Sequence, residues 1–499
     1  MSDSALAAQP TSRLRWLILV TVIVGTFLGR LDQTIVNLAL PKIINDFGIT
    51  VSSAGWIATA YILANAIFVP IWGKLGDTIG RKKVYVIGFV VFIIGSVLAG
   101  LAWNLPSMIV FRVIQAIAGS ADYPTAMAIL AVTFPSNKER AQALGIWSSS
   151  FAAAAVFGPL IGGPLIDNFS WRAVFLINLP VGLIGLLMAL AFIHESRSEV
   201  VTKKFDWSGA LTLGVALAAL VLVLDRGFDW GWLSGNSIAS YCTVIVASVF
   251  FYFVEKKCPE PIVDFKFFRI PVFVSALVNN FVVFMGMMGS IFLIPVFAQT
   301  FLGYGATETG YLFIPMAAAL MVAAPIGGRL TGKVESRYVI TISTLGAAFG
   351  IFLFSFIDPR SGPLAIIVPL SVMAFFMGFA MAQRTNIIAS AVPASEVGIA
   401  SSLLALTRNI SGAFGISIFA TVLNNTILAN VLSISQASSV QTTNPMIRAT
   451  ATALIILKAQ VMAYATVFRV AAAVVFVGAV SALWIKVQNE KTDVEVFVE

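Results

Sequence analysis

Long apolar runs separated by short polar or basic stretches dominate the chain. The runs are continuous rather than alternating in polarity, which predicts helices and argues against a membrane β-barrel. Because a helix needs roughly 20 apolar residues to cross a bilayer, we expect an all-α polytopic membrane protein with about fourteen spans. The runs cover residues 16–38, 53–71, 84–102, 106–132, 141–166, 174–193, 207–224, 238–254, 272–297, 309–326, 339–356, 364–381, 399–423 and 461–485.

Polar connections divide the runs into three parts. Residues 1–193 hold the first six spans and residues 272–499 hold the last six, so each part is expected to form a six-helix bundle. The segment 194–271 is expected to be a linker that carries two extra transmembrane helices. The polar stretch 424–460, within the last part, is expected to be a long loop outside the membrane.

Composition and charge agree with this class of protein. Hydrophobic residues make up 59% of the chain and charged residues only 11%, whereas roughly a quarter of the residues of a globular protein are charged. The net charge of +8 comes from basic residues scattered between the apolar runs. This pattern indicates orientation in a membrane rather than a nucleic-acid-binding face. The positive-inside rule and an even number of spans predict that both termini are cytoplasmic.

Little in the sequence suggests catalysis. The chain has a single histidine, two cysteines without metal-ligand spacing, and no GxxxxGK[ST] phosphate loop. We therefore expect that it is not an enzyme and that it has no cofactor or metal. ATP hydrolysis is not expected to be its energy source.

Charged side chains inside the apolar runs are the first candidates for function. Arg30 and Asp32 lie in the first span and Arg112 lies in the fourth. A charge in the middle of a bilayer costs roughly 2.5–3.5 kcal/mol, so such residues face a cavity or a partner. Asp32 and Arg112 are expected at similar depth. Asp32 is either half of a fixed ion pair or a group that gains and loses a proton, and Arg112 is either its partner or a snorkelling surface side chain.

A second buried pair is predicted from Asp122, in the middle of the fourth span. We expect it to pair with Arg30, because burying one of these charges without the other would cost roughly 3–5 kcal/mol. The two pairs would bring the formal charge of the cavity near zero. Asp32, Arg112, Arg30 and Asp122 are therefore the candidate proton-coupling residues.

The loop after the second span combines glycines with paired basic residues. Glycine allows a tight turn between two helices. Asp77 is expected to cap the third span or to pair with a basic residue of another helix, a lock that one conformation holds and another releases. The candidate residues of this conformational lock are Gly73, Asp77, Gly80, Arg81 and Lys82.

The fifth span contains glycines and a proline at positions where another helix can approach. Small residues allow close helix contact, and proline with glycine bends a helix. These residues are Gly158, Pro159, Gly162 and Gly163. A tight helix crossing with no further role is the alternative.

Residues 73–83 resemble the signature loop of the Major Facilitator Superfamily, and residues 155–163 resemble its antiporter motif. The stretches 30–41, 171–182 and 407–412, with the two extra helices, are similar to those of the fourteen-span drug:proton antiporters, the group that includes EmrB and QacA. The resemblance covers essentially the whole chain.

The resemblance implies the major facilitator fold, in which two six-helix bundles here flank two extra central helices in the inner (plasma) membrane. It implies a proton-coupled efflux antiporter that exports amphipathic drugs or toxic small molecules by alternating access. The implied partners are a small amphipathic substrate, protons and the lipid bilayer, with a membrane-fusion adaptor protein as a further candidate and no nucleic acid. Arg30 and Asp122 depart from the family's pattern, which weakens the case for a strictly cationic cargo.

The substrate pocket is expected between the two halves, near the midplane of the membrane. Methionine and aromatic surfaces adapt to varied apolar ligands, although ordinary helix packing is the alternative for each residue. The arginines favour a second possible function, export or import of a defined metabolite such as a siderophore or an organic acid. The candidate substrate-binding residues are Gln115, Asn279, Asn280, Met285, Gln299 and Arg384.

Overall fold

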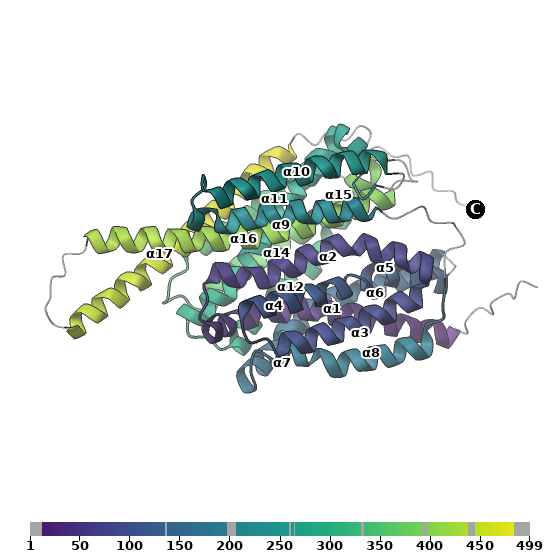
Figure 1. Ribbon diagram of the computed structural model, residues 1–499, viewed down its shortest axis with the longest axis horizontal. Helices are drawn as coiled ribbons and strands as arrows, with labels where there is room; N and C mark the ends of the chain where they lie inside the picture. Colours follow the sequence, from purple (N-terminus) through teal and green to yellow (C-terminus); the bar gives the residue numbers. More distant parts are fainter. Residues whose placement is uncertain are drawn as a thin grey trace, which may run out of the picture.

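The computed structural model describes residues 12–134, 137–196, 206–258, 261–263, 265–330, 334–392, 397–437 and 445–483. These residues are almost all helical, and no strand occurs among them. Figure 1 shows most helices lying along one common direction, so that they form an elongated bundle. A helix satisfies its backbone hydrogen bonds within its own segment, which is what a bilayer requires.

The helices of the first half begin at local capping signals. Thr50 Oγ1 accepts a hydrogen bond from Ser53 N at the start of the second helix. Asn104 and Ser107 form a capping box at the start of the fourth. The helices are α1 (Ser12–Phe47), α2 (Val51–Ile79), α3 (Arg81–Gly100), α4 (Leu105–Gly119), α5 (Asp122–Thr133), α6 (Asn137–Asn168), α7 (Ala173–Leu176) and α8 (Asn178–Phe192).

Two further helices, α9 (Trp207–Trp230) and α10 (Gly235–Lys257), pack against each other, and α9 also contacts α2 and α16. A short 3-10 helix, η1 (Phe265–Arg269), leads into the second half. The second half contains α11 (Pro271–Phe301), α12 (Ala306–Gly328), α13 (Ser336–Leu353), η2 (Phe354–Phe356), α14 (Leu364–Phe379), α15 (Met381–Ser390), α16 (Val397–Ala437) and α17 (Pro445–Ala482).

Apart from a few residues at their ends, the described parts of the fourteen apolar runs lie in these helices, singly or in consecutive pairs. In the described part of the chain, eleven helices are long and apolar enough to cross a membrane. The fourth span differs because it is interrupted at Ser120 and Ala121, between α4 and α5. The twelfth is interrupted at Ala380, between α14 and α15.

The prediction of a long loop at 424–460 was wrong. Helix α16 continues to Ala437 and α17 already begins at Pro445, so most of this segment is helical. Residues 424–437 contain neither glycine nor proline, and Pro445 occupies a position that suits the start of a helix. The two helices project beyond the bundle (Figure 1). We call that end, where α1 ends at Phe47, the hairpin end, and the end where α1 begins the N-terminal end.

Large apolar side chains cover the outside of the bundle. Leu187 on α8, Leu211 on α9 and Ile245 on α10 are 65%, 69% and 62% exposed. Such a surface is unstable in water and stable against lipid chains. The protein is therefore a polytopic membrane protein.

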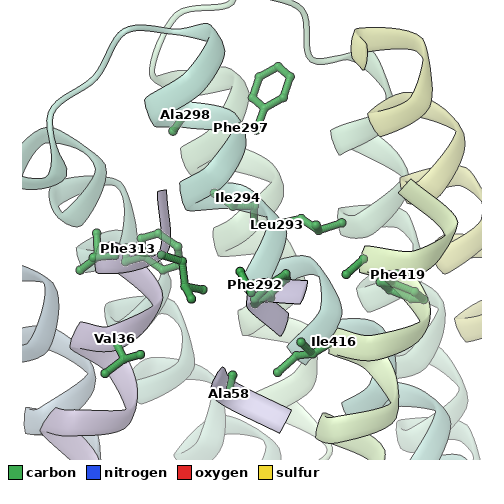
Figure 2. Close-up of a cluster of buried hydrophobic side chains, with 14 of the residues drawn as sticks. Val36, Ala58, Phe292, Leu293, Ile294, Phe297, Ala298, Phe313, Ile416 and Phe419 are labelled. Carbon is green, nitrogen blue, oxygen red and sulfur yellow. The ribbon is translucent and has the colours of Figure 1, made fainter. Parts of the chain in front are cut away.

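The two halves meet in one apolar core. Figure 2 shows Val36 and Ala58 from the first half lying near Phe292 and Ile416 from the second. All four side chains are nearly inaccessible. This contact positions the inner faces of both halves around the cavity described below.

Candidate functional site

An ion pair between α1 and α4 is buried within the first half. Arg112 Nη1 lies 2.6 Å from Asp32 Oδ2, and the side chains are 2% and 0% exposed. This geometry agrees with the expectation that the two residues meet. It does not agree with the alternative, in which Arg112 would extend to the membrane surface. Removing one partner of such a pair leaves an uncompensated buried charge.

The other carboxylate oxygen of Asp32 is held by two amides. Gln115 Nε2 and Asn178 Nδ2 each donate to Asp32 Oδ1 at 2.9 Å. Both amides also donate to Ser96 Oγ, at 3.0 and 2.7 Å. Gln115, expected to bind substrate, belongs instead to this network. Sequence reasoning missed Ser96 and Asn178, although Asn178 lies in the family-like stretch 171–182.

Aromatic rings surround the guanidinium group of Arg112. Its Cζ atom lies 4.0 Å from the centre of the Tyr61 ring and 5.7 Å from that of Phe175. Tyr61 is only 2% exposed. A cation over a desolvated ring is stabilised by about 2 kcal/mol. Tyr61 therefore stabilises the arginine from α2, and sequence analysis did not identify it.

A central cavity of about 250 Å³ lies between the halves. Its wall is formed by α1, α2, α4 and α6 of the first half and by α11, α12, α14 and α16 of the second. Arg112 is the only charged residue among the described residues of this wall, and Asp32 lies behind it. The polar side chains beside Arg112 are Gln33, Thr34, Asn37 and Tyr61.

The rest of the wall is apolar and consists largely of flexible side chains. Met287, Met288, Met316 and Phe313 all line the cavity. Flexible thioether chains adapt to ligands of different shape, and mostly apolar cavities with a few polar groups are typical ligand sites. This cavity is therefore the candidate binding site for a small amphipathic molecule.

The other predicted substrate residues do not line this cavity. Asn279 donates to Thr344 Oγ1 and to Gly478 O, and Arg384 donates to Asn279 Oδ1 at 3.0 Å. Both are buried inside the second half. Asn280 accepts a hydrogen bond from Arg408.

Met285 and Gln299 also lie outside the cavity wall. The backbone of Met285 packs closely against Gly415 of α16. Gln299 Nε2 donates to Leu38 O at 3.0 Å and so links the two halves. Their positions indicate packing and interface roles.

Arg30 and Asp122 do not form the expected ion pair. Asp122 Oδ2 accepts a hydrogen bond from Thr26 Oγ1 at 2.7 Å, and Arg30 Nη1 donates to Gln33 Oε1 at 3.3 Å. Thr26 also accepts from Trp147 Nε1. Thr26, and not Arg30, therefore makes the direct contact with Asp122, while Arg30 hydrogen-bonds to Gln33 on its own helix.

The glycine-rich stretch that was expected to be a loop forms the last turns of α2 and the start of α3 at the N-terminal end, and only Gly80 separates the two helices. Gly80 has a φ of +118°, which only glycine adopts readily. Glu195, which follows α8, accepts hydrogen bonds from Lys82 N and Lys83 N at the start of α3. Gly73, Arg81 and Lys82 are in the described part, whereas the side chain of Asp77 lies outside it. The lock stays a prediction, and Glu195 is a cap that sequence analysis missed.

The glycines of α6 are positions of close contact. A Cβ atom on Gly158 would overlap Thr34, and one on Gly162 would lie 2.8 Å from Ile35 Cγ2, both on α1. A Cβ atom on Gly163 would overlap Thr307 of the other half. Pro159 borders the cavity. The motif thus brings α6 against α1 and α12.

A carboxylate joins the two halves at the hairpin end. Asp167 Oδ1 accepts from Ala306 N at 3.1 Å and Oδ2 from Thr307 N at 2.8 Å, at the start of α12. Burial raises the pKa of Asp167, but the hydrogen bonds from Thr307 and Ala306 outweigh it and hold that pKa below its ordinary value. Together with the Gln299–Leu38 hydrogen bond, this contact closes the halves at the hairpin end.

Comparison with known proteins agrees with this architecture. The family model described as the Major Facilitator Superfamily matches residues 22–416. The multidrug transporter protein MdtP of Bacillus subtilis is 33% identical over 411 residues, which cover 82% of this chain and 75% of that protein. The multidrug export protein EmrB of Haemophilus influenzae is 31% identical over 411 residues, covering 81% and 79%.

The fold is also similar to that of solved transporters. A bacterial homologue of the human lysosomal transporter Spinster, in an inward-facing and occupied conformation, matches with a TM-score of 0.68. The match covers 95% of this chain and 97% of that one at 18% identity. At that identity the similarity concerns the fold alone.

Proposed function

The chain belongs to the Major Facilitator Superfamily of membrane transporters, and we propose that it exports amphipathic small molecules across the inner (plasma) membrane in exchange for protons. The observation that carries this proposal is the ion pair of Asp32 with Arg112, in which only the arginine borders the cavity. Relatives named for multidrug export favour this function over transport of one defined metabolite.

The pair gives a physical reason for exchange. When Asp32 is ionised, its charge cancels that of Arg112 beside the cavity. When Asp32 is protonated, Arg112 keeps its charge without this counter-ion, and the potential in the cavity becomes more positive. A cationic cargo is then bound less tightly, so that proton and cargo exclude each other. An anionic cargo would instead be bound more tightly when Asp32 is protonated. Cargo and proton would then cross the membrane in the same direction as each other.

The distribution of basic residues supports one orientation of the protein in the membrane. Basic residues such as Arg81, Lys82 and Lys83 lie at the N-terminal end, and the positive-inside rule places that end in the cytoplasm. The hairpin end, closed by Asp167 and Gln299, would face outside. Breaking these contacts would open the cavity outward, as alternating access requires. An adaptor partner stays a prediction.

The test measures efflux of ethidium from cells that express the protein, with and without a proton uncoupler. We expect the uncoupler to stop efflux and Asp32→Asn to reduce it to background at an unchanged amount of membrane protein. Asp46→Asn is the matched control, because Asp46 lies on the same helix and pairs with Arg172 at the hairpin end. A panel of neutral and anionic compounds extends the test to other cargo. Uncoupler-resistant efflux, or full efflux by Asp32→Asn, would contradict the proposal.

A further inference from the structure

Asp122 is a partly buried acid that the ion pair of Asp32 with Arg112 does not use. Its Oδ2 atom accepts a hydrogen bond from Thr26, and its Oδ1 atom is buried without one of ordinary geometry, although the Tyr85 hydroxyl lies beside the carboxyl group. A buried polar atom without a partner is costly, and the cost is larger for a charged group. A proton on Oδ1 would remove the charge, so the site suits a carboxyl group that alternates between two protonation states.

A small cavity of about 30 Å³ adjoins this carboxyl group. Its wall contains the Tyr85 side chain and four glycines, Gly25, Gly29, Gly88 and Gly119, which leave space where other residues would fill it. A volume of roughly 10–15 Å³ is enough for one water molecule. The cavity therefore has room for a proton-conducting water beside Asp122.

The cavity lies one helical turn from the network around Asp32. Leu28 on α1 lines it and Asp32 follows four residues later; Phe92 on α3 lines it and Ser96 follows four residues later. Gly119 on α4 lines it, and Gln115 precedes Gly119 by four residues. Since four residues make about one turn of a helix, all three helices lead from the cavity to the same carboxylate.

Asp122 is next in the chain to a residue at the boundary between the two halves. Its neighbour Tyr123 is 42% exposed. Arg408 of the second half acts electrostatically with Tyr123. Asp122 also lies nearer than Asp32 to the N-terminal end, because it hydrogen-bonds to Thr26, which precedes Asp32 on α1. Asp122 is thus placed between the buried Asp32 network and the end that we assign to the cytoplasm.

We propose that Asp122 is a second proton-binding group and relays protons between Asp32 and the cytoplasm within the first half. The O–H bond of protonated Asp32 breaks, water in the cavity carries the proton, and an O–H bond forms on the Asp122 carboxylate. Asp32 is left ionised against Arg112, and Asp122 later releases the proton to water on the cytoplasmic side. This inference rests on the proposed proton exchange and adds a route to it.

The groups that face Asp122 come from three helices. Thr26 and Arg30 face it from α1, Tyr85 faces it from α3, and Trp147 of α6 donates to Thr26. Arg30, which hydrogen-bonds to Gln33, is also close enough to Asp122 to favour its carboxylate electrostatically. The charged state is therefore tolerated for part of the cycle, as a relay requires.

The experiment uses purified protein in liposomes, with an internal pH dye and ethidium as the cargo. Gly29→Val adds a side chain at a position that lines the cavity, and its Cβ atom meets nothing within 4 Å. Asp122→Asn removes the relay group. Gly235→Val, at another helical glycine with open space around it, is the matched control.

We expect both relay variants to slow proton-driven ethidium transport and the associated proton flux by about tenfold or more. Ethidium–ethidium exchange should stay at the wild-type rate. Deuterated water should slow proton-driven transport more in the variants than in the wild type, because proton transfer becomes rate-limiting. Packing damage alone would slow the exchange as well. If Asp122→Asn does not fold, Gly29→Val decides alone. Wild-type proton flux in a folded relay variant, or equal losses of both activities, would overturn the relay. Failure of the wild type to exchange protons would instead overturn the proposed function.

Discussion

Arg112 borders the central cavity, while Asp32, 2.6 Å away, is fully buried behind it. The arginine is thus the only member of the pair that a bound molecule can touch. Any effect of Asp32 on cargo must pass through the position or the uncompensated charge of Arg112. This relationship makes the two residues distinguishable by mutation.

Arg112→Gln should destabilise the protein more than Asp32→Asn does. The first change leaves a carboxylate in a dry site and should lower the free energy of unfolding by about 3–5 kcal/mol. The second leaves an arginine that cavity water can reach. Thermal unfolding in detergent measures both. The double variant should be more stable than the sum of the single losses predicts, and additive losses would contradict coupling.

Tyr61→Ala should weaken both the arginine contact and cargo binding. Loss of the ring removes a cation–π contact of about 2 kcal/mol and enlarges the cavity near Arg112. Tyr61→Phe keeps the ring and should retain near-wild-type ethidium affinity, measured by fluorescence polarisation. Equal loss in both variants would point to the hydroxyl group instead.

Asp167→Asn should open the hairpin end. The amide accepts only one of the two backbone hydrogen bonds and lacks the charge that favours the start of α12. The wild-type contact is present above the ordinary pKa of 3.8 and is lost only as pH falls through the lowered value. It should therefore not respond to pH near neutrality. Spin-label distances across this end should lengthen in the variant, and unchanged distances would contradict the assignment.

Gly163→Val should arrest transport without preventing folding of each half. The added side chain would overlap Thr307 and hold α6 away from α12, so the hairpin end could not close. Ethidium efflux should fall to background, while the protein still reaches the membrane. Gly235→Val adds the same side chain where nothing lies within 4 Å and should transport normally. Efflux at the control rate in Gly163→Val would show that this contact is dispensable.

Rotation about the helix axis explains the errors in the predicted site. The boundaries of an apolar run fix roughly how deep a residue lies, and on that basis Asp32 and Arg112 were paired. The boundaries of a run do not fix which neighbouring helix a side chain faces. Asp122 therefore reaches Thr26 instead of Arg30, and Gln115 turns toward Asp32 rather than the cavity.

The apolar pattern also could not predict that a helix continues past the end of its apolar run. Residues 424–437 looked like a loop because they are less apolar, yet α16 continues through them. Apolarity reports contact with lipid or core, whereas the backbone hydrogen bonds of a helix need only suitable residues and a partner helix. The same limit hid the interruption of the fourth span at Ser120 and Ala121.

The amino-acid sequence by itself determined that this protein lies in a membrane as apolar helices, because so few charged residues cannot keep such a chain in water. It also determined the family and the depth of its unusual charges. Only the tertiary structure decided that Asp32 is shielded by Arg112 and that Met287 and Met288 form the cavity wall. Those facts depend on how helices far apart in sequence turn toward one another, and packing of complete side chains sets that orientation.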